Sequence, residues 1–426
     1  KALEYFDQAL SIWRETGARR GEAAAMNNAG KVWSDLGEAG KALELDYRAL
    51  VIWREVKDRR GEALALSTIG SAYYVQKDMD KALASKLAAL ALAKAAGDPD
   101  IEGGIESSLM IGFRSENRRE EAILFGMDAV NSYQQIRKNI SGLGKELQTG
   151  FAQSKSATYR TLAELLVQAD RLAEAEQVLD LLKEQELKEV VRGAADNPEA
   201  RVEPLKLSSA QQTVQNELAA PEKTAVALMD ASAEYAELQA KAARTPEEAA
   251  RLKTLEARIE AGNAEVSDFF RKTLYPELAQ KAGAQDANAL LSKEKSDVSR
   301  LQNTLAELGP HVMGIRLLLG DERAFAIVIT AQGRKKFELK ATPAELRSKV
   351  LQVRDDLRTP ASDPKPHLAE LFAMAIAPFG DELNALEKSS QEKGRVPTLL
   401  WSLDGAMRYL PMAAMYDGGH YLAERF

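Results

Sequence analysis

The sequence predicts a mostly α-helical protein made of a superhelix of repeated helix pairs, a helical connector and a C-terminal α/β segment. A 40-residue repeat runs through the first part of the chain. The middle is rich in Ala, Glu and Lys and contains strong helix-start signals. Short apolar, β-branched runs follow near residue 310. We therefore expect repeats over 1–190, a connector over 191–306 and an α/β segment over 307–426.

The repeat is visible directly in the amino-acid sequence. Residues 1–23 read KALEYFDQALSIWRETGARRGEA, and residues 41–63 read KALELDYRALVIWREVKDRRGEA. A third copy starts near 81, a more diverged fourth near 121, and a further unit lies near 158–190. Apolar residues recur at helical spacing in each copy, so each unit is predicted to be a pair of amphipathic helices. We expect Trp13 and Trp53 to lie in the core between them.

This pattern resembles tetratricopeptide repeats, in a long-helix variety of about 40 residues per unit. The resemblance implies a superhelix whose concave face holds a protein or peptide partner. Asn27 and Asn28, in the segment MNNAG, resemble the asparagines that hydrogen-bond the backbone of an extended ligand in such repeats. Lys31, one turn further on, is expected to face the same groove. These three residues are the candidate partner-binding site; the alternative is that they are polar surface residues without a ligand.

The connector is predicted to be helical. Thr245–Pro246–Glu247–Glu248 combines a threonine cap, a proline in the first turn and a glutamate three residues after the cap, which predicts a helix over about 246–261. Gly262–Asn263 and Asp196–Asn197–Pro198 are predicted loops. A further helix is expected through SDFFRKTLYPELAQ, with an interruption at Pro276.

The C-terminal segment changes from helical to strand periodicity. The runs 312–320 and 323–333, separated by Gly320–Asp321–Glu322, predict a hairpin, and residues 335–340 predict a third strand. Thr342 begins a capping box, so a helix is expected to about residue 357, and the segment HLAELFAMAIAPF predicts a second one. Residues 396–405 read as a buried strand that ends at Asp404.

These sequence segments, in this order, resemble the first third of a CHAT domain, a caspase-like branch of the cysteine peptidases. The resemblance rests on GIRLLLGDERAFAIVIT, TLLWSLDGAMRYLPMAAM and HYLAERF. It departs from the family at Ser402–Leu403, where a proline usually precedes the Asp-Gly pair. The family implies a histidine–cysteine dyad on a parallel-stranded α/β core, placed downstream of this segment. His311, His367 and His420 do not lie in the family's histidine context, so we expect all three to be structural or exposed.

The composition excludes several kinds of site. The 64 acidic and 57 basic residues give a net charge of −7, which offers no basic surplus for nucleic acid. The chain has no cysteine, which rules out a disulfide, a thiolate zinc site and a cysteine nucleophile within these residues. Asp355–Asp356 is expected to be a pair of solvated carboxylates. We therefore predict no cofactor, no metal and no catalytic residue in this chain.

Taken together, these features predict the regulatory and partner-binding portion of a caspase-like cysteine peptidase. In it the repeats would bind a protein partner, and the complete CHAT domain would cleave a protein substrate. Such architectures suggest a bacterial protein with a role in defence or programmed death. Without a signal region or a long apolar run, we expect it to be cytoplasmic and to contact no membrane. The alternative is a repeat scaffold or adaptor with a degenerate, non-catalytic C-terminal domain.

Overall fold

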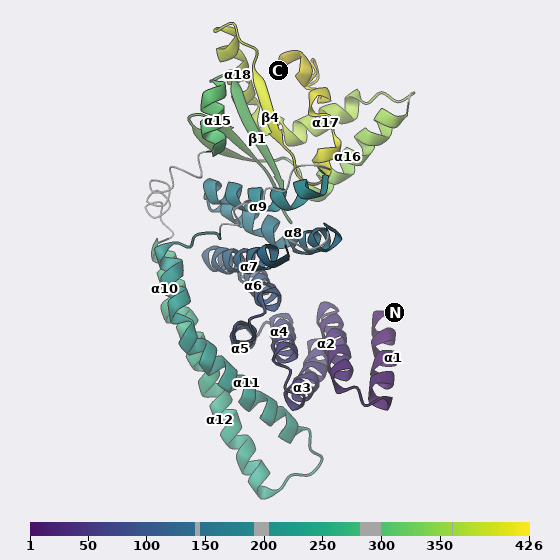
Figure 1. The fold of residues 1–426 in the computed structure, drawn as a ribbon, viewed down its shortest axis with the longest axis vertical. Helices are drawn as coiled ribbons and strands as arrows, with labels where there is room; N and C mark the ends of the chain where they lie inside the picture. The colour runs from purple at the N-terminus through teal and green to yellow at the C-terminus, as the bar shows by residue number, and fades with distance from the viewer. Residues whose placement is uncertain (141–144, 191–203, 282–299, 360) are drawn as a thin grey trace. The chain divides into compact units, whose positions relative to one another are not determined.

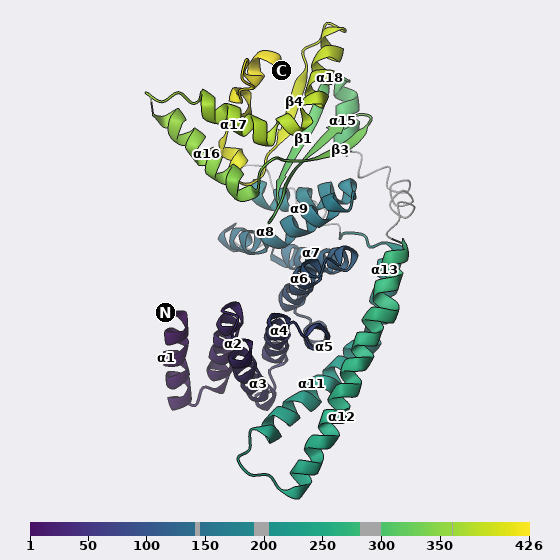
Figure 2. The same ribbon diagram turned by 180° about the vertical axis from the view of Figure 1, so that it is seen from behind.

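The computed structural model describes residues 1–140, 145–190, 204–281, 300–359 and 361–426 (Figures 1 and 2). The chain divides into two compact units: residues 1–143 with 199–286, and residues 144–198 with 287–426. Each unit therefore combines two segments that are distant in the sequence. The predicted connector loop at Asp196–Asn197–Pro198 lies outside the described residues. In the described ranges, no helix is long and apolar enough to cross a lipid bilayer.

The first unit begins with an array of helix pairs, which confirms the predicted helical repeat. Helices start at residues 19, 59 and 99, and their partners start at 39, 79 and 119, so the 40-residue period holds for both helices of a pair. The bounds are α1 Ala2–Glu15, α2 Arg19–Asp35, α3 Ala39–Glu55, α4 Arg59–Val75, α5 Met79–Ala96, α6 Pro99–Ser115 and α7 Arg119–Ile140.

The turns of the array repeat every 20 residues. A residue in the left-handed backbone conformation follows each helix from α1 to α6, where it lets the chain reverse and satisfies the last carbonyl groups. These residues are Gly17, Gly37, Lys57, Lys77, Gly97 and Asn117, with φ between +53° and +82°. Gly37 adopts this conformation without steric cost, whereas the two lysines occupy a conformation that costs a residue with a side chain roughly 1–2 kcal/mol.

Glycines let the helices approach closely. A Cβ added at Gly61 would lie 2.2 Å from the ring of Trp53, so the indole packs directly on the backbone of the next helix. Trp53 is buried, as predicted. Gly21 receives Trp13 in the same way, but Trp13 is 40% exposed, so its predicted burial is wrong. The difference arises because α3 lies between α2 and α4, whereas α1 packs on α2 from one side only.

The connector packs on the array as α10 Ser209–Glu217, α11 Ala219–Gln239, α12 Pro246–Phe269, the π-helical turn η1 Phe270–Leu274 and α13 Tyr275–Lys281. The capping box at Thr245 is confirmed, with the Thr245 side chain accepting from the backbone of Glu248. The predicted loop at Gly262–Asn263 is wrong because α12 continues through it. A Cβ at Gly262 would lie 3.3 Å from Leu228, so this glycine serves the close packing of α11 and α12. The π-helical turn ends two residues before Pro276, which cannot donate a backbone hydrogen bond.

An aromatic cluster attaches the connector to the array. Phe113 on α6 stacks on Phe125 of α7, with ring centres 5.4 Å apart, and Phe270 lies 5.9 Å from Phe113. The Arg118 guanidinium lies 3.5 Å from the centre of the Tyr275 ring. α11 and α12 also run along α5, so the connector forms part of the folded unit rather than a free arm.

The second unit is built on a four-stranded sheet with the order β3-β2-β1-β4. β1 and β2 are antiparallel with Ile315 opposite Val328, β2 and β3 are antiparallel, and β1 and β4 are parallel with Ile315 opposite Trp401. The strands are β1 Val312–Leu319, β2 Ala324–Thr330, β3 Gly333–Glu338 and β4 Thr398–Ser402. The helices are α8 Lys145–Gln168, α9 Leu172–Val190, α15 Arg300–Leu308, α16 Pro343–Arg358, α17 Lys365–Ala375, η2 Ala377–Phe379, α18 Gly380–Gln391, η3 Gly405–Tyr409, η4 Met412–Ala414 and α19 Leu422–Arg425.

Both faces of the sheet are covered. Alternate residues of β1, including Ile315 and Leu317, face a core formed with α16, α17 and α18. The other face carries Arg316 and Leu318, which are also buried, and it receives α15 and the α8–α9 pair. The predicted α/β architecture is therefore confirmed, with the hairpin, the third strand and both helices in place (Figure 1). Residues 396–405 were predicted to form a buried strand, but β4 is only partly buried because it pairs on one side, with β1.

Candidate functional site

The three predicted partner-binding residues lie on α2 but differ in what they contact. Asn27 is buried: its Oδ1 accepts from Nε1 of Trp53 at 3.1 Å, and its Nδ2 donates to Oγ1 of Thr68 at 3.0 Å. The amide therefore ties α2 to α3 and α4. Asn28 and Lys31 are exposed on α2, one turn apart. A partner can reach these two side chains directly, whereas Asn27 already uses both of its polar atoms.

One asparagine of the array does hold a non-helical backbone segment. Asn131 on α7 donates from Nδ2 to the carbonyl oxygen of Leu205 at 3.0 Å and accepts from the Leu205 amide at 2.6 Å. Leu205 belongs to the non-helical segment that precedes α10, and its side chain is buried. This is the interaction that sequence analysis assigned to Asn27 and Asn28, made here at a different asparagine and with the chain's own connector. A repeat alignment alone does not identify Asn131, because its partner lies 74 residues away.

A buried lysine and a buried aspartate occupy equivalent positions of consecutive repeats. Lys86 on α5 is only 1% exposed, and its Nζ donates to Oγ of Ser67 at 3.0 Å and of Ser71 at 2.8 Å. Burial lowers the pKa of Lys86 to about 7; the negative charge of Asp46 opposes this shift, and the charge of Lys31 adds to it. Lys31 is therefore electrostatically coupled to the interior of the array.

Asp46 on α3 precedes Lys86 by one repeat length and is fully buried. Neither of its carboxyl oxygens has a hydrogen-bond partner among the residues that the structure describes. Burial raises the pKa of Asp46 to about 8. Its side chain lies against the backbone of Gly30, where an added Cβ would be 2.4 Å from Oδ1. The spacing of 40 residues between Asp46 and Lys86 is the signal by which the sequence could have identified both.

A buried acidic pair lies where the array meets the connector. Glu106 accepts from the Ser132 hydroxyl at 2.8 Å, and Asp128 accepts from Nε2 of Gln215 on α10 at 2.5 Å. Burial raises the pKa of Asp128 to about 7. Burial, and then the negative charge of Asp128, raise the pKa of Glu106 well above its ordinary value.

In the second unit, Asp404 organises the end of the sheet. It is 2% exposed and follows β4 directly. Its Oδ2 accepts from the Leu319 amide at the end of β1 at 3.0 Å, and its Oδ1 accepts from the Gly405 amide at 2.8 Å. Nε and Nη2 of Arg160 on α8 each lie 3.3 Å from Oδ1. Asp404 therefore fixes the carboxyl edge of the parallel pair, the edge at which open α/β sheets carry their sites.

The α8–α9 pair holds this sheet through charged groups. Glu164 is fully buried, and its carboxylate accepts from the amides of Asp321 at 2.8 Å and Arg323 at 3.2 Å, in the β1–β2 turn. Arg316 on β1 donates to the carbonyl of Glu176 at 3.0 Å and pairs with Asp180 at 2.6 Å, both on α9. Sequence analysis placed α8 and α9 with the repeats and gave no sign of these contacts.

The histidines and carboxylates of the second unit form no metal cluster in the described residues. Nδ1 of His367 lies 2.5 Å from Oδ2 of Asp356, and the Ser362 hydroxyl donates to Oδ1 of the same residue. These two hydrogen bonds, that from His367 first, lower the pKa of Asp356. Asp356 is thus a paired, half-buried group and not the freely solvated carboxylate that we expected. His311 contacts Arg395, and the exposed His420 donates its backbone amide to Asp417.

Comparison with known proteins adds one assignment. No curated protein matches the chain. The tetratricopeptide character of the repeats rests on the resemblance alone, because no repeat family matches them. The C-terminal segment that contains α17, α18, β4, the Asp404 turn and α19 does have a match: residues 365–426 match the profile of the CHAT domain.

Proposed function

We propose that this chain is the regulatory and partner-binding portion of a caspase-like cysteine peptidase. Its tetratricopeptide-type repeats bind a protein partner, and the CHAT domain to which residues 365–426 belong cleaves a protein substrate. The reacting histidine and cysteine lie outside the 426 residues of this chain. As part of the same proposal, the protein is a cytoplasmic regulator of bacterial origin.

The observation that carries this proposal is the CHAT match on a strand–turn segment whose buried Asp404 fixes the carboxyl edge of the sheet. In such an enzyme the imidazole helps to generate a thiolate. The thiolate then attacks the scissile carbonyl carbon, and the proton passes to the leaving amine. The part of the chain described here supplies the sheet on which those groups would be positioned and makes no proton transfer itself.

The contact between Asn131 and Leu205 supports the partner-binding role of the array. It demonstrates within this molecule that an asparagine on a repeat helix can hold a non-helical backbone by both of its polar atoms. Asn28 presents the same amide on the exposed surface of α2, and Lys31 adds a positive charge beside it. These two residues therefore suit the backbone of a peptide that carries a negative charge nearby.

The full-length gene tests the peptidase assignment. A histidine–glycine pair followed by a strand and a cysteine, within about the length of one further domain, is expected downstream of Phe426. Replacement of that cysteine by alanine should abolish cleavage of a protein substrate and leave partner binding by the repeats unchanged. A gene without the pair, or a variant that loses cleavage and binding together, would instead favour the non-catalytic adaptor.

The partner-binding assignment has its own test. Asn28→Ala should weaken partner affinity, by up to about tenfold for one lost hydrogen bond, without a change in the helical circular dichroism of the protein. The matched control is Asn139→Ala, which changes an exposed asparagine near the end of α7. Loss of helical signal in Asn28→Ala would assign the residue to structure rather than to binding.

A further inference from the structure

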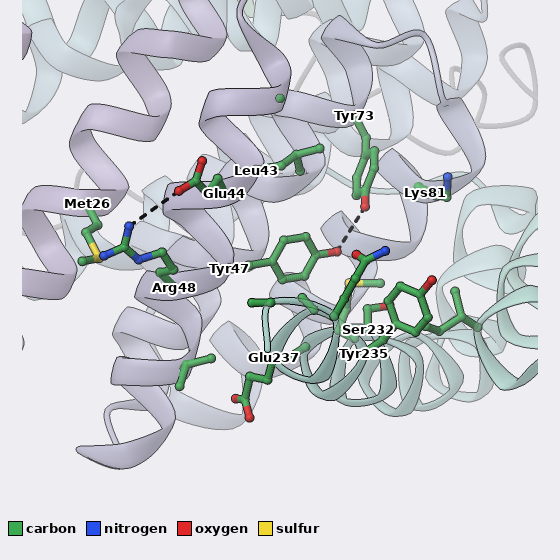
Figure 3. Close-up of a pocket in the computed structure, with 18 of the residues that line it drawn as sticks. Met26, Leu43, Glu44, Tyr47, Arg48, Tyr73, Lys81, Ser232, Tyr235 and Glu237 are labelled. Carbon is green, nitrogen blue, oxygen red and sulfur yellow. Dashed lines mark hydrogen bonds and ion pairs between the residues drawn. The ribbon is translucent and has the colours of Figure 1, made fainter. Parts of the chain in front are cut away.

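The first unit contains a groove that the proposed function does not use. It lies between α3 on one side and the α11–α12 hairpin on the other, with α2, α4 and α5 contributing at its ends, and it encloses about 1260 Å³ (Figure 3). Asn28 and Lys31 do not line it. The lining is largely apolar, and the groove is larger than the ~300–1,000 Å³ typical of small-molecule pockets. We propose that this groove binds a basic amphipathic helix of a protein partner.

Tyrosines and aliphatic side chains form the interior of the groove. The hydroxyls of Tyr47 on α3 and Tyr73 on α4 lie 3.1 Å apart, and Figure 3 shows the Tyr47 ring extending from α3 toward α11. Burial is the largest of the effects that raise the pKa of Tyr47, so this hydroxyl stays neutral and its ring serves as an apolar surface. Val51 on α3 and Ile259 on α12 are half-buried on opposite walls. Such a lining accepts apolar side chains spaced along one face of a helix.

The positive charges at the groove are already neutralised. Arg19 pairs with Glu22 at 2.7 Å, Arg48 with Glu44 at 3.7 Å, and Lys81 with Asp78 at 2.6 Å. Figure 3 shows the Arg48–Glu44 pair on the α3 side. Each of the cations that line the groove therefore already has a carboxylate partner.

The negative charges of the opposite wall are not neutralised. Glu256 and Glu260 lie one turn apart on α12, Glu237 lies on α11, and all three are exposed. Among the residues that the structure describes, none of these three glutamates has an ion pair or hydrogen bond. The rim on the α11–α12 side is therefore an unpaired acidic ridge beside an apolar groove.

An apolar interior with an acidic rim favours a partner that is apolar on one face and positively charged at its flanks. A helix with apolar residues at positions i, i+3 or i+4 and i+7 would fill the interior, as helix-in-groove partners do. Lysine and arginine residues on its flanks would face Glu237, Glu256 and Glu260. An acidic helix would instead place like charges opposite one another, which opposes binding. The proposal does not depend on peptidase activity and concerns a surface separate from the Asn28 face.

A synthetic peptide tests the proposal on the intact chain. The probe is a fluorescein-labelled amphipathic peptide of about 18 residues, or five helical turns, with leucine along one face and lysine on the other. Its counterpart carries glutamate in place of every lysine. We expect the basic peptide to bind in fluorescence anisotropy, with an affinity that falls as salt is raised, and the acidic peptide not to bind.

Two charge-reversal variants locate the binding. The double substitution Glu256→Lys and Glu260→Lys should weaken binding of the basic peptide at least about tenfold, because two favourable charge pairs become repulsive. The matched control is Asp7→Lys with Asp35→Lys, which makes the same change in net charge at exposed acids of α1 and α2 outside the groove. This control should alter the affinity less than about twofold, since neither residue lines the groove and salt screens exposed charges.

The substitution Ile259→Ser tests the apolar interior separately. It should also weaken binding of the basic peptide, while a cooperative thermal melting curve shows that the variant is folded. Failure of the basic peptide to bind the wild-type chain would overturn the proposal. Equal binding of the basic and the acidic peptide would also overturn it. The same holds if the groove variant and the control variant lose affinity for the basic peptide equally. If instead the chain forms a dimer in sedimentation analysis that Glu256→Lys with Glu260→Lys dissociates, the groove binds a second copy and the basic partner is wrong.

Discussion

At Asp46 and Lys86, burial opposes the charged form of the side chain. Both lie at the same position of consecutive repeats, and both are essentially inaccessible to water. Burial shifts their pKa values in opposite directions, up for the acid and down for the base. Each shift means that the charged form is less stable in the folded array than in the unfolded chain, so the stability of the array must depend on pH.

Asp46 and Lys86 make the free energy of unfolding change with pH in opposite directions, Asp46 mainly below pH 8 and Lys86 mainly above pH 7. Between the unfolded pKa of an aspartate, about 4, and the folded value of about 8, folded Asp46 binds a proton that the unfolded chain has lost. Its contribution therefore falls as pH rises, by at most about 1.4 kcal/mol per pH unit. Asp46→Asn should remove this slope, as measured by urea unfolding of the chain at a series of pH values. A slope between pH 5 and 8 that is unchanged in the variant would contradict the assignment.

Lys86 gives the opposite slope. Its folded pKa of about 7 lies below the ordinary value of 10.5, so between these values the unfolded chain binds the proton that the folded chain has released. The free energy of unfolding should therefore rise with pH from about 7 toward 10, again by at most about 1.4 kcal/mol per pH unit. In Lys86→Met this rise should be absent, in the same urea series. Persistence of the rise would show that other groups cause it.

Asn27 joins three helices by its amide, which separates its role from that of Asn28. Removal of the amide leaves the indole N–H of Trp53 buried without its acceptor, at a cost of about 1–3 kcal/mol. Asn27→Ala should therefore lower the free energy of unfolding by that amount, and Asn28→Ala by less than about 0.5 kcal/mol. Chemical denaturation measures both. Equal effects at the two sites would mean that the buried amide contributes nothing.

The sequence distinguished these residues only in part. The MNNAG segment was recognised as a candidate binding site, but the difference between Asn27 and Asn28 depends on Thr68 and Trp53, which lie 41 and 26 residues further along the chain. A buried tryptophan usually requires a hydrogen-bond acceptor. The predicted burial of Trp53 therefore implies that a hydrogen-bond acceptor lies near its indole N–H. The sequence alone does not identify Asn27 as that acceptor.

At the scale of elements, the turns between helices are the most regular feature of the array. Left-handed residues follow one another every 20 positions, but glycine occupies only some of them. Lys57 and Lys77 are exposed and adopt φ values of +53° and +61°. Their backbone conformation therefore works against stability, and in the part of the chain that the structure describes neither lysine forms an ion pair that would offset this cost.

A matched pair of substitutions tests the turn geometry. Lys77→Gly should raise the free energy of unfolding by about 0.5–1 kcal/mol, since glycine adopts positive φ without steric cost. Gly37→Ala, at φ +82°, should lower it by about 1 kcal/mol or more. Thermal melting of the two variants beside the wild type would show the opposite shifts. Shifts of the same sign would mean that these residues do not adopt the left-handed conformation.

The start of a helix was easier to predict than its continuation. Thr245 and Thr342 each form the capping box that their sequences indicate, because the cap depends on residues three positions apart. Gly262–Asn263 was predicted to be a loop, yet α12 passes through it. The reason is tertiary: Gly262 packs on Leu228 of α11, and only the contact between the two helices reveals why a glycine is used there.

At the scale of the whole molecule, the compact units do not follow the order of the chain. α8 and α9 resemble the repeats in sequence, yet they cover one face of the β-sheet through Arg160, Glu164 and Arg316. The connector, in turn, packs on the repeat array. Contacts such as Arg160–Asp404 join residues 244 positions apart, which explains why periodicity could predict the elements but not their grouping into units.

This grouping predicts which fragments fold. Residues 300–426 alone keep α15 but lack α8 and α9 on the face of β1 and β2 that carries Leu318 and Ile327, so they should bind a hydrophobic dye and unfold without cooperativity. Residues 145–190 joined to 300–426 by a flexible linker should give a cooperative melting transition. Calorimetry of both fragments measures whether each one unfolds cooperatively. Cooperative unfolding of the shorter fragment would show that α8 and α9 are dispensable for the sheet.

The central claim is that this chain regulates a thiol peptidase whose reacting residues lie elsewhere in the protein. The most direct measurement is to incubate a bacterial cell extract with the full-length protein and to identify new protein N-termini by mass spectrometry, with and without prior alkylation by iodoacetamide. The account predicts new termini with the full-length protein, none after alkylation, and none with residues 1–426 alone. New termini that appear equally with residues 1–426, or that resist alkylation, would contradict it.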